Sequence, residues 1–222
     1  MINLILRLLK AVFLSLYEGL RGFLGSFHKR DTKPRFKGEY KDGKEHGPWE
    51  IFYENGRLEF KGTYNSGRRD GPWETYHQNG RIKVKGCSRV GIPDGPCEKY
   101  HENGQLFWKS TYKNGERVGA FEKFSTTGQL KSHGDYRNDV LDGLWQYYYD
   151  SGQLKKVGNY KLGKRVGLWQ YYYDNDQLGK RGNFRDDKEE GLWEYFDEEG
   201  QLREKRHYKK GYCTSLSELS AA

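Results

Sequence analysis

The sequence predicts an all-β repeat protein: an elongated antiparallel meander of about fourteen strands, formed by seven 24-residue hairpin units over residues 37–204. Three observations predict this fold. The triplets Gly-Pro-Trp and Gly-Leu-Trp recur at spacings of 24 residues or multiples of 24. The first three units turn at Asn-Gly pairs, which supply the positive φ of a tight hairpin. The composition, with 16% aromatic residues and 29 glycines, is typical of many short strands and turns.

Glycines and rings occupy fixed columns in each unit. A first glycine opens one strand, and in most units an aromatic residue stands two positions later, as at Gly38 and Tyr40. A second glycine precedes a tryptophan column by two positions and a further ring column by five. Because these two columns lie three residues apart, their strand needs a β-bulge or a glycine kink if both are to reach one core. The predicted tryptophan column consists of Trp49, Trp73, Cys97, Phe121, Trp145, Trp169 and Trp193.

The repeat pattern departs from its consensus in two places. In the third and fourth units, Ser88, Cys97, Ser110 and Phe121 replace the usual tyrosine, tryptophan, glycine and tryptophan, which predicts a weaker or bent segment. Residues 205–222 keep the spacing of half a unit, so they are expected to form a half-repeat and a C-terminal cap. The stretch 214–219 is expected to close that end as a short helix.

Residues 1–36 differ from the repeats in charge. They hold seven basic and two acidic side chains, a net charge of +5, whereas the other 186 residues hold 32 basic and 29 acidic ones. The nearly balanced repeats argue against nucleic acid as the partner. Cys87, Cys97 and Cys213 cannot all pair with one another and have no metal-ligand spacing, so we expect free thiols in a reducing, cytoplasmic compartment.

Residues 1–28 predict an amphipathic helix, and residues 29–36 a basic linker. The longest uncharged run, 11–17, is far shorter than the roughly 20 residues that span a bilayer. We therefore favour a helix that lies in the plane of the inner membrane face, beside anionic lipid. A helix docked on the sheet or on a partner, a cleaved targeting peptide and a true membrane span remain alternatives. The predicted membrane-binding side chains are Ile5, Leu9, Phe13, Leu16, Leu20 and Phe23, with Arg7, Lys10 and Arg21 on the polar side.

No combination of residues predicts catalysis, a cofactor or a metal. His77 and His101 are equivalent positions two strands apart, about 10 Å, which is too far for one ion. A repeated glutamate column at 50, 74, 98, 122 and 194 offers similar environments, whereas a general acid and base need different ones, so it is interpreted as a solvated face. The glycines open no helix with a phosphate-binding motif and are interpreted as turn residues.

Two tyrosine triplets predict the partner surface. Residues 147–149 and 171–173 are all tyrosine, and because consecutive strand residues point to opposite faces, one set of rings should meet solvent. Tyrosine is favoured at protein interfaces because it offers a large rigid surface with a polar tip. The predicted partner-binding residues are Tyr147, Tyr149, Tyr171 and Tyr173; ordinary cross-strand packing of these rings is the alternative.

The pattern Gly-x-Tyr, Gly-x-Trp-x-x-Tyr and Asn-Gly-x-Leu resembles the MORN repeat family, most closely a 24-residue variant found in bacterial proteins described as antitoxins. The resemblance covers about three quarters of the chain. It implies an elongated sheet used for protein contacts, dimerisation or membrane attachment rather than chemistry. We therefore expect a non-enzymatic scaffold or protein-binding module, with a homo-oligomer and an anionic membrane surface as further partners. The alternative is an antitoxin or immunity protein that neutralises a toxin by direct binding.

Overall fold

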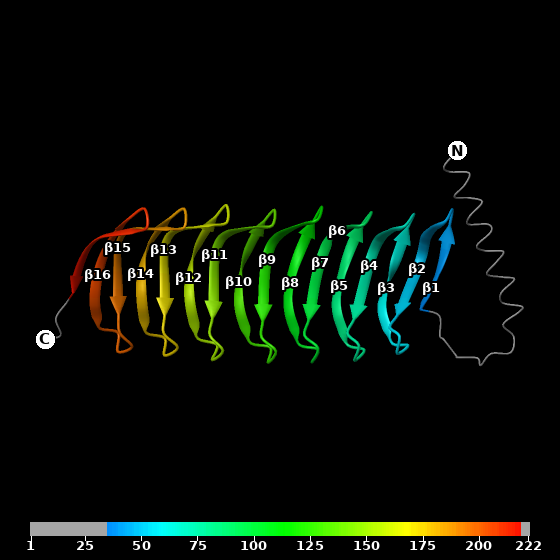
Figure 1. Ribbon diagram of the computed structural model, residues 1–222, viewed down its shortest axis with the longest axis horizontal. Coiled ribbons are helices and arrows are strands. Elements are labelled where there is room, and N and C mark those ends of the chain that lie inside the picture. The colour runs from blue at the N-terminus through cyan, green and yellow to red at the C-terminus, as the bar shows by residue number, and fades with distance from the viewer. Residues whose placement is uncertain (1–34, 219–222) are drawn as a thin grey trace, which may run out of the picture. The chain divides into compact units, whose positions relative to one another are not determined.

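The computed structural model describes residues 35–218, which form one antiparallel sheet of 17 strands. Consecutive strands lie side by side along the sheet, so the chain makes a simple meander (Figure 1). This confirms the predicted all-β repeat fold. The predicted helix at 1–28 and the linker up to residue 34 lie outside the described residues.

The strands follow the 24-residue period. Fourteen strands were expected from seven hairpin units; the structure adds two from the half-repeat and divides one strand of the third unit into β6 and β7. The strands are β1 (Phe36–Lys41), β2 (Lys44–Phe52), β3 (Leu58–Asn65), β4 (Arg68–Tyr76), β5 (Ile82–Arg89), β6 (Ile92–Pro93), β7 (Gly95–Tyr100), β8 (Leu106–Lys113), β9 (Glu116–Phe124), β10 (Leu130–Arg137), β11 (Val140–Tyr148), β12 (Leu154–Lys161), β13 (Lys164–Tyr172), β14 (Leu178–Arg185), β15 (Lys188–Phe196), β16 (Leu202–Lys209) and β17 (Tyr212–Glu218).

The expected C-terminal helix at 214–219 is wrong, because these residues up to Glu218 belong to strand β17. A two-residue turn at Lys210 and Gly211, with φ of 53° and 87°, reverses the chain after β16. Two successive positive φ values are the conformation that joins antiparallel strands without splaying them. The backbone of β17 therefore pairs with β16 from Lys209 and Tyr212 onward instead of forming bonds within a helix.

The two ring columns lie on opposite faces of the sheet. Bulges interrupt the register in every unit, as expected, for example between Gly158 and Asn159. They do not, however, bring both columns to one core. Phe52 and Glu50 are two residues apart and share the face opposite Trp49. On that face the Lys37 ammonium lies 5.2 Å from the centre of the Phe52 ring. We call the side that carries Trp49, Trp145, Trp169 and Trp193 the tryptophan face, and the other side the ladder face.

The core of the sheet is a row of indole rings that lie flat over glycines. A Cβ atom at Gly158 would come within 2.2 Å of the Trp169 ring, so only glycine lets the ring lie there. The ring meets Tyr160 and Phe184 edge-on at centroid distances of 5.1 and 6.1 Å, and its Nε1 donates to the Asn159 carbonyl at 3.2 Å. Trp169 is consequently 0% exposed, although the described residues form a single layer.

The third unit is irregular, whereas the fourth, which was also expected to be weaker or bent, has two unbroken strands, β8 and β9. Pro93 has no amide hydrogen, and the strand is interrupted between β6 and β7. The Trp73 ring approaches Gly86 on the following strand and donates from Nε1 to the Ser88 hydroxyl at 2.9 Å. The four tryptophans that define the tryptophan face donate instead to carbonyls of the preceding strand. Ser88 and Cys97 are smaller than the tyrosine and tryptophan of other units, and this leaves room for the reversed ring.

Candidate interaction surface

A row of alternating charge runs across the ladder face. From Lys37 to Glu122 each member is paired in register with the next, because the glutamate column and a lysine column share one period. Gln146, Val157 and Gln170 interrupt the alternation before it resumes at Arg181. Ion pairs join Lys85 to Glu98 and Lys109 to Glu122, each at 2.9 Å. The glutamates are therefore balanced by neighbouring cations rather than simply solvated. The charged members are Lys37, Glu50, Lys61, Glu74, Lys85, Glu98, Lys109, Glu122, Arg181, Glu194 and Lys205.

The charges of this row are held by tyrosine hydroxyls as well as by ion pairs. The Tyr100 hydroxyl donates to the Glu98 carboxylate, and this bond, with the Lys85 ammonium beside it, lowers the pKa of Glu98. The equivalent Tyr76 donates to Glu74; burial and that bond raise the pKa of Tyr76 to about 12. Sequence reasoning missed this network, although the basic column at the same period was its signal.

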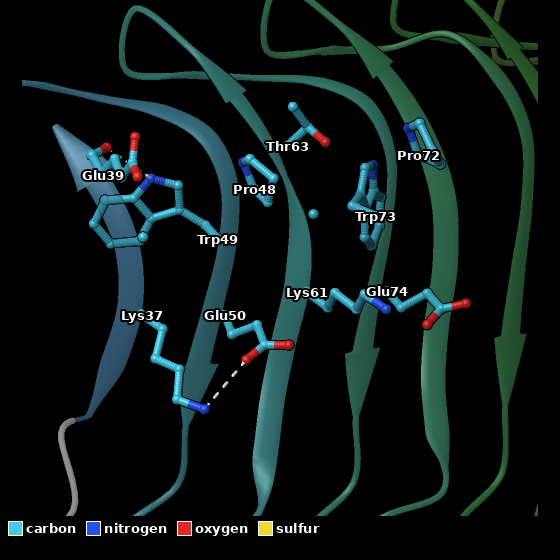
Figure 2. A pocket seen from close by; sticks show the side chains of 12 residues that line it. Lys37, Glu39, Pro48, Trp49, Glu50, Lys61, Thr63, Pro72, Trp73 and Glu74 are labelled. Carbon is cyan, nitrogen blue, oxygen red and sulfur yellow. Dashed lines mark hydrogen bonds and ion pairs between the residues drawn. The ribbon is translucent and has the colours of Figure 1, made fainter. Parts of the chain in front are cut away.

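A hollow of about 700 Å³ lies on the ladder face across β1 to β4. Figure 2 shows its two sides: a charged row that includes Lys37 and Glu50, and a second row that includes Pro48, Thr63 and Pro72. Glycines at 38 and 62 contribute to its lining. The charges around this hollow are mixed, so it favours no single sign of ligand.

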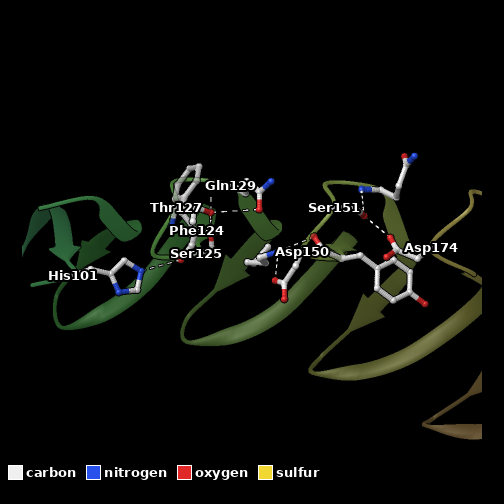
Figure 3. A network of polar contacts seen from close by, with 11 residues as sticks. His101, Phe124, Ser125, Thr127, Gln129, Asp150, Ser151 and Asp174 are labelled. Atoms are coloured by element: carbon white, nitrogen blue, oxygen red, sulfur yellow. Dashed lines mark hydrogen bonds and ion pairs between the residues drawn. The ribbon is translucent and has the colours of Figure 1, made fainter. Parts of the chain in front are cut away.

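In five of the seven repeats, one side chain ties the end of the long strand to the next unit. Tyr149 and Tyr173 each donate a hydroxyl hydrogen to a carbonyl 23 residues on, in Tyr172 and Phe196, at 2.8 and 2.9 Å. His77 and His101 occupy the same column, and their Nε2 atoms lie 3.1 and 3.2 Å from equivalent carbonyls (Figure 3 shows His101). The two histidines therefore serve as links between repeats.

The predicted partner-binding tyrosines fall into two separate rows. Tyr147 and Tyr171 lie within β11 and β13 on the tryptophan face, whereas Tyr149 and Tyr173 follow the ends of these strands. All four rings are half-buried. The second pair thus has a structural role as a link between repeats, and only the first pair lies in the middle of a face.

Tyr147 and Tyr171 belong to a row in which tyrosines alternate with lysines. The register pairs Tyr147 with Lys156, Lys156 with Tyr171, Tyr171 with Lys180, and Lys180 with Tyr195. We call these five residues the tyrosine–lysine file. The Lys156 ammonium lies 4.3 Å from the centre of the Tyr147 ring, and the Lys180 ammonium 4.9 Å from that of Tyr171. These distances are typical of cation–π contacts.

Burial affects the titration of this file. It raises the pKa of Tyr147, whose hydroxyl lies 3.3 Å from that of Tyr160, and it raises the pKa of Tyr171. The same burial, with the charges of Arg165 and Lys155 nearby, lowers the pKa of Lys156. At neutral pH the phenols are therefore neutral hydrogen-bonding groups, and the charge of Lys156 is poorly stabilised by its surroundings.

The described residues show no other candidate site. Within 35–218 there is no group of three or more His, Cys, Asp or Glu side chains that could hold a metal ion. The same part of the chain contains no helix long and apolar enough to cross a membrane. Cys87, Cys97 and Cys213 are free thiols, and burial raises the pKa of Cys97, which stands in the tryptophan column.

The comparison with protein families confirms the resemblance. The model of the MORN repeat variant matches seven consecutive segments: residues 45–66, 69–88, 93–114, 117–138, 141–162, 165–186 and 189–210. Because these segments cover more than half of the chain, the protein belongs to the MORN repeat variant family. Repeats of this family are generally non-enzymatic modules that bind proteins or membranes. No curated protein matches the chain. The antitoxin role, dimerisation and membrane attachment stay predictions.

Proposed function

We propose that the protein is a non-enzymatic scaffold in the cytoplasm that binds a protein partner through its tryptophan face, at the units around Tyr147 and Tyr171. The tyrosine–lysine file supports this proposal. Its rings are half-buried against the indole row, so they lose little conformational freedom on binding, and part of each residue stays accessible to solvent. Rigid aromatic surface of this kind is enriched at the centres of protein interfaces.

Substitution of Tyr147 and Tyr171 by serine tests this surface. We expect capture of the partner, once purified with the full chain, to weaken at least tenfold, as for central interface tyrosines. Tyr148 and Tyr172 are matched controls, because they are the neighbouring tyrosines of the same strands, are also half-buried and lie on the ladder face. The serine variants of this second pair should keep full capture. Equal loss in both pairs would indicate general unfolding, and no loss in either would refute the assigned face.

The tyrosines at the strand ends need a different test. Tyr149 and Tyr173 bond the next repeat through their hydroxyls, so serine would remove a structural link together with any contact to a partner. Phenylalanine removes only the hydroxyl. If these two rings also touch the partner, Tyr149→Phe and Tyr173→Phe should keep most of the capture while serine removes it.

We further propose that the N-terminal segment holds this scaffold at the inner membrane face. The sequence pattern of residues 1–28, with apolar side chains such as Leu9 and Phe13 opposite Arg7 and Lys10, supports the proposal. The full chain should sediment with vesicles that contain anionic lipid, and a chain that begins at Asp31 should not. Equal partitioning of the two forms would refute the tether and leave the protein-binding face unaffected.

A further inference from the structure

The lysines of the two faces have different surroundings. On the ladder face, Lys85 and Lys109 each lie 2.9 Å from a glutamate oxygen. On the tryptophan face, Lys156 and Lys180 are paired across the strands with tyrosines, and among residues 35–218 neither forms an ion pair with a carboxylate. Both are half-buried. Two half-buried positive charges therefore lie in one file without an ion-pair partner, although Glu189 is near enough to raise the pKa of Tyr171 and Tyr195, and such an arrangement is unfavourable in an isolated sheet.

The cations that flank this file do have partners. Arg165 is held by Asp187 at 2.9 Å, and Arg206 by Glu204. These carboxylates are therefore already engaged with guanidinium groups and are not shared with Lys156 or Lys180. Within the file itself, Lys156 and Lys180 are thus left without an ion pair.

The tyrosines of the file add hydrogen-bond donors to these charges. The hydroxyls of Tyr147 and Tyr160 lie 3.3 Å apart, and those of Tyr195 and Tyr208 lie 3.1 Å apart. A hydroxyl pair that shares one hydrogen bond uses only one of its two O–H groups as a donor, so each pair has a second donor for an incoming acceptor. Ammonium and phenol donors together suit a carboxylate.

We propose that the tyrosine–lysine file is the docking track for an acidic segment of the protein partner, whose carboxylates are received by Lys156 and Lys180. This inference rests on the proposed function and specifies the chemistry of the partner. Equivalent lysines lie two strands apart, about 10 Å at roughly 4.8 Å per strand. A polyproline II segment places every third side chain on one side at about 9 Å, so acidic residues at every third position match the track.

The ring geometry disfavours nucleic acid on this track. Base stacking needs a free aromatic face, but lysine ammonium groups lie over the rings of Tyr147 and Tyr171 at 4.3 and 4.9 Å. Arg206 lies over Tyr195 in the same way at 4.6 Å. Each ring of the file thus has a cation over it, and a carboxylate can bind that cation without displacing it from the ring.

The test uses the full chain and a fluorescent peptide of four Glu-Pro-Pro triplets, measured by fluorescence anisotropy. We expect saturable binding that weakens as salt is raised, and no binding of the matched Gln-Pro-Pro peptide. Lys156→Gln and Lys180→Gln should each weaken binding at least fivefold. Lys85→Gln and Lys109→Gln on the ladder face are the controls and should bind as the parent does. In NMR titrations, the peptide should raise the pKa of Lys156 toward that of an ordinary lysine, because the carboxylate stabilises its charge.

Several results would overturn the inference. One is a peptide affinity that is the same in the parent and in both tryptophan-face lysine variants. Another is a stronger and equally lysine-dependent affinity for oligothymidylate, or for vesicles that contain phosphatidylserine, than for the glutamate peptide. If the Tyr147 and Tyr171 serine variants lose the partner while the Lys156 and Lys180 variants keep it, the proposed function holds and the acidic track is wrong. Partner capture that survives all four substitutions would refute both.

Discussion

The packing of each tryptophan over a glycine predicts a strong coupling between Gly158 and Trp169. The φ angle of Gly158 is not in the left-handed region, so alanine there should by itself stabilise the protein by about 0.5 kcal/mol through the unfolded state. Its Cβ, however, would lie 2.2–2.5 Å from three atoms of a fully buried indole. Overpacking of this kind costs about 1–3 kcal/mol. We expect Gly158→Ala to destabilise the sheet by about 1–2 kcal/mol.

A smaller ring should relieve that cost. The chain already combines a larger residue at the glycine position with a smaller ring: Ser110 replaces the glycine and Phe121 replaces the tryptophan. These two residues face each other across the strands, because their neighbours Lys109 and Glu122 are paired in register. In a Trp169→Phe background, Gly158→Ala should therefore cost little, which gives a coupling energy of about 1 kcal/mol or more.

Hydrogen exchange of the β12 and β13 amides is the suitable measurement, because each repeat contacts only its neighbours and the loss should be local. Gly143→Ala is the control. Gly143 has a φ of 74° and no atom near its Cβ direction, so its cost is backbone strain and should be equal in both backgrounds. If Gly158→Ala costs as much beside phenylalanine as beside tryptophan, or stabilises the parent, the account of the core is wrong.

Three further predictions concern single residues. Val90 is a β-branched residue with a φ of 51°, so Val90→Asn should stabilise by about 1 kcal/mol and raise Tm by about 2–4 °C in a thermal melt. Ser110 is buried and its hydroxyl has no hydrogen-bond partner among residues 35–218. Ser110→Ala should therefore raise the free energy of unfolding by about 1 kcal/mol, seen as a higher urea midpoint; a lower midpoint would contradict this. The Arg117 hydrogen bond lowers the pKa of Asp139 from its ordinary value of 3.8. The stabilisation that this bond gives the folded protein is therefore present at pH 5, and it is lost as the pH falls through the lowered pKa. Asp139→Asn should reduce the drop in urea midpoint between pH 5 and 2.5.

The period of the sequence was sufficient to predict the sheet but not the side chains that meet across it. The spacing of Trp145, Trp169 and Trp193 predicts a buried column, and the structure confirms it. The C-terminal helix was wrong because a short stretch without rings has no period of its own, whereas the edge of β16 supplies backbone partners. The two ring columns were assigned to one core because a bulge was expected to rotate one of them, and the register shows that it does not.

The candidate site could be predicted only in part, for a related reason. The tyrosine triplets were visible in the sequence, but their separation into a central row and a linking row depends on where β11 and β13 end. The lysines opposite them lie in the next strand, 9 or 15 positions away, as Tyr147, Lys156 and Tyr171 show. A search for one repeated column sees residues 24 apart and therefore misses a row that takes alternate members from two columns.

Because each row takes alternate members from two columns, near-identical repeats can carry a local function. In the N-terminal units, the row that contains the tyrosine–lysine file is apolar, with Ile51, Phe60 and Val84 at the equivalent places. It carries two lysines on either side of a ring at Lys99, Trp108 and Lys123, and it alternates tyrosine with lysine from Tyr147 to Tyr195, where both contributing columns have changed. Each strand still pairs with its neighbour on both sides of this change, although Cys97 and Phe121 replace the indoles between them, so side chains of the file can vary without disturbing the meander. Selective binding is therefore expected from the C-terminal units, and an acidic segment should protect the amides of β11 to β15 from hydrogen exchange more than those of β2 to β5.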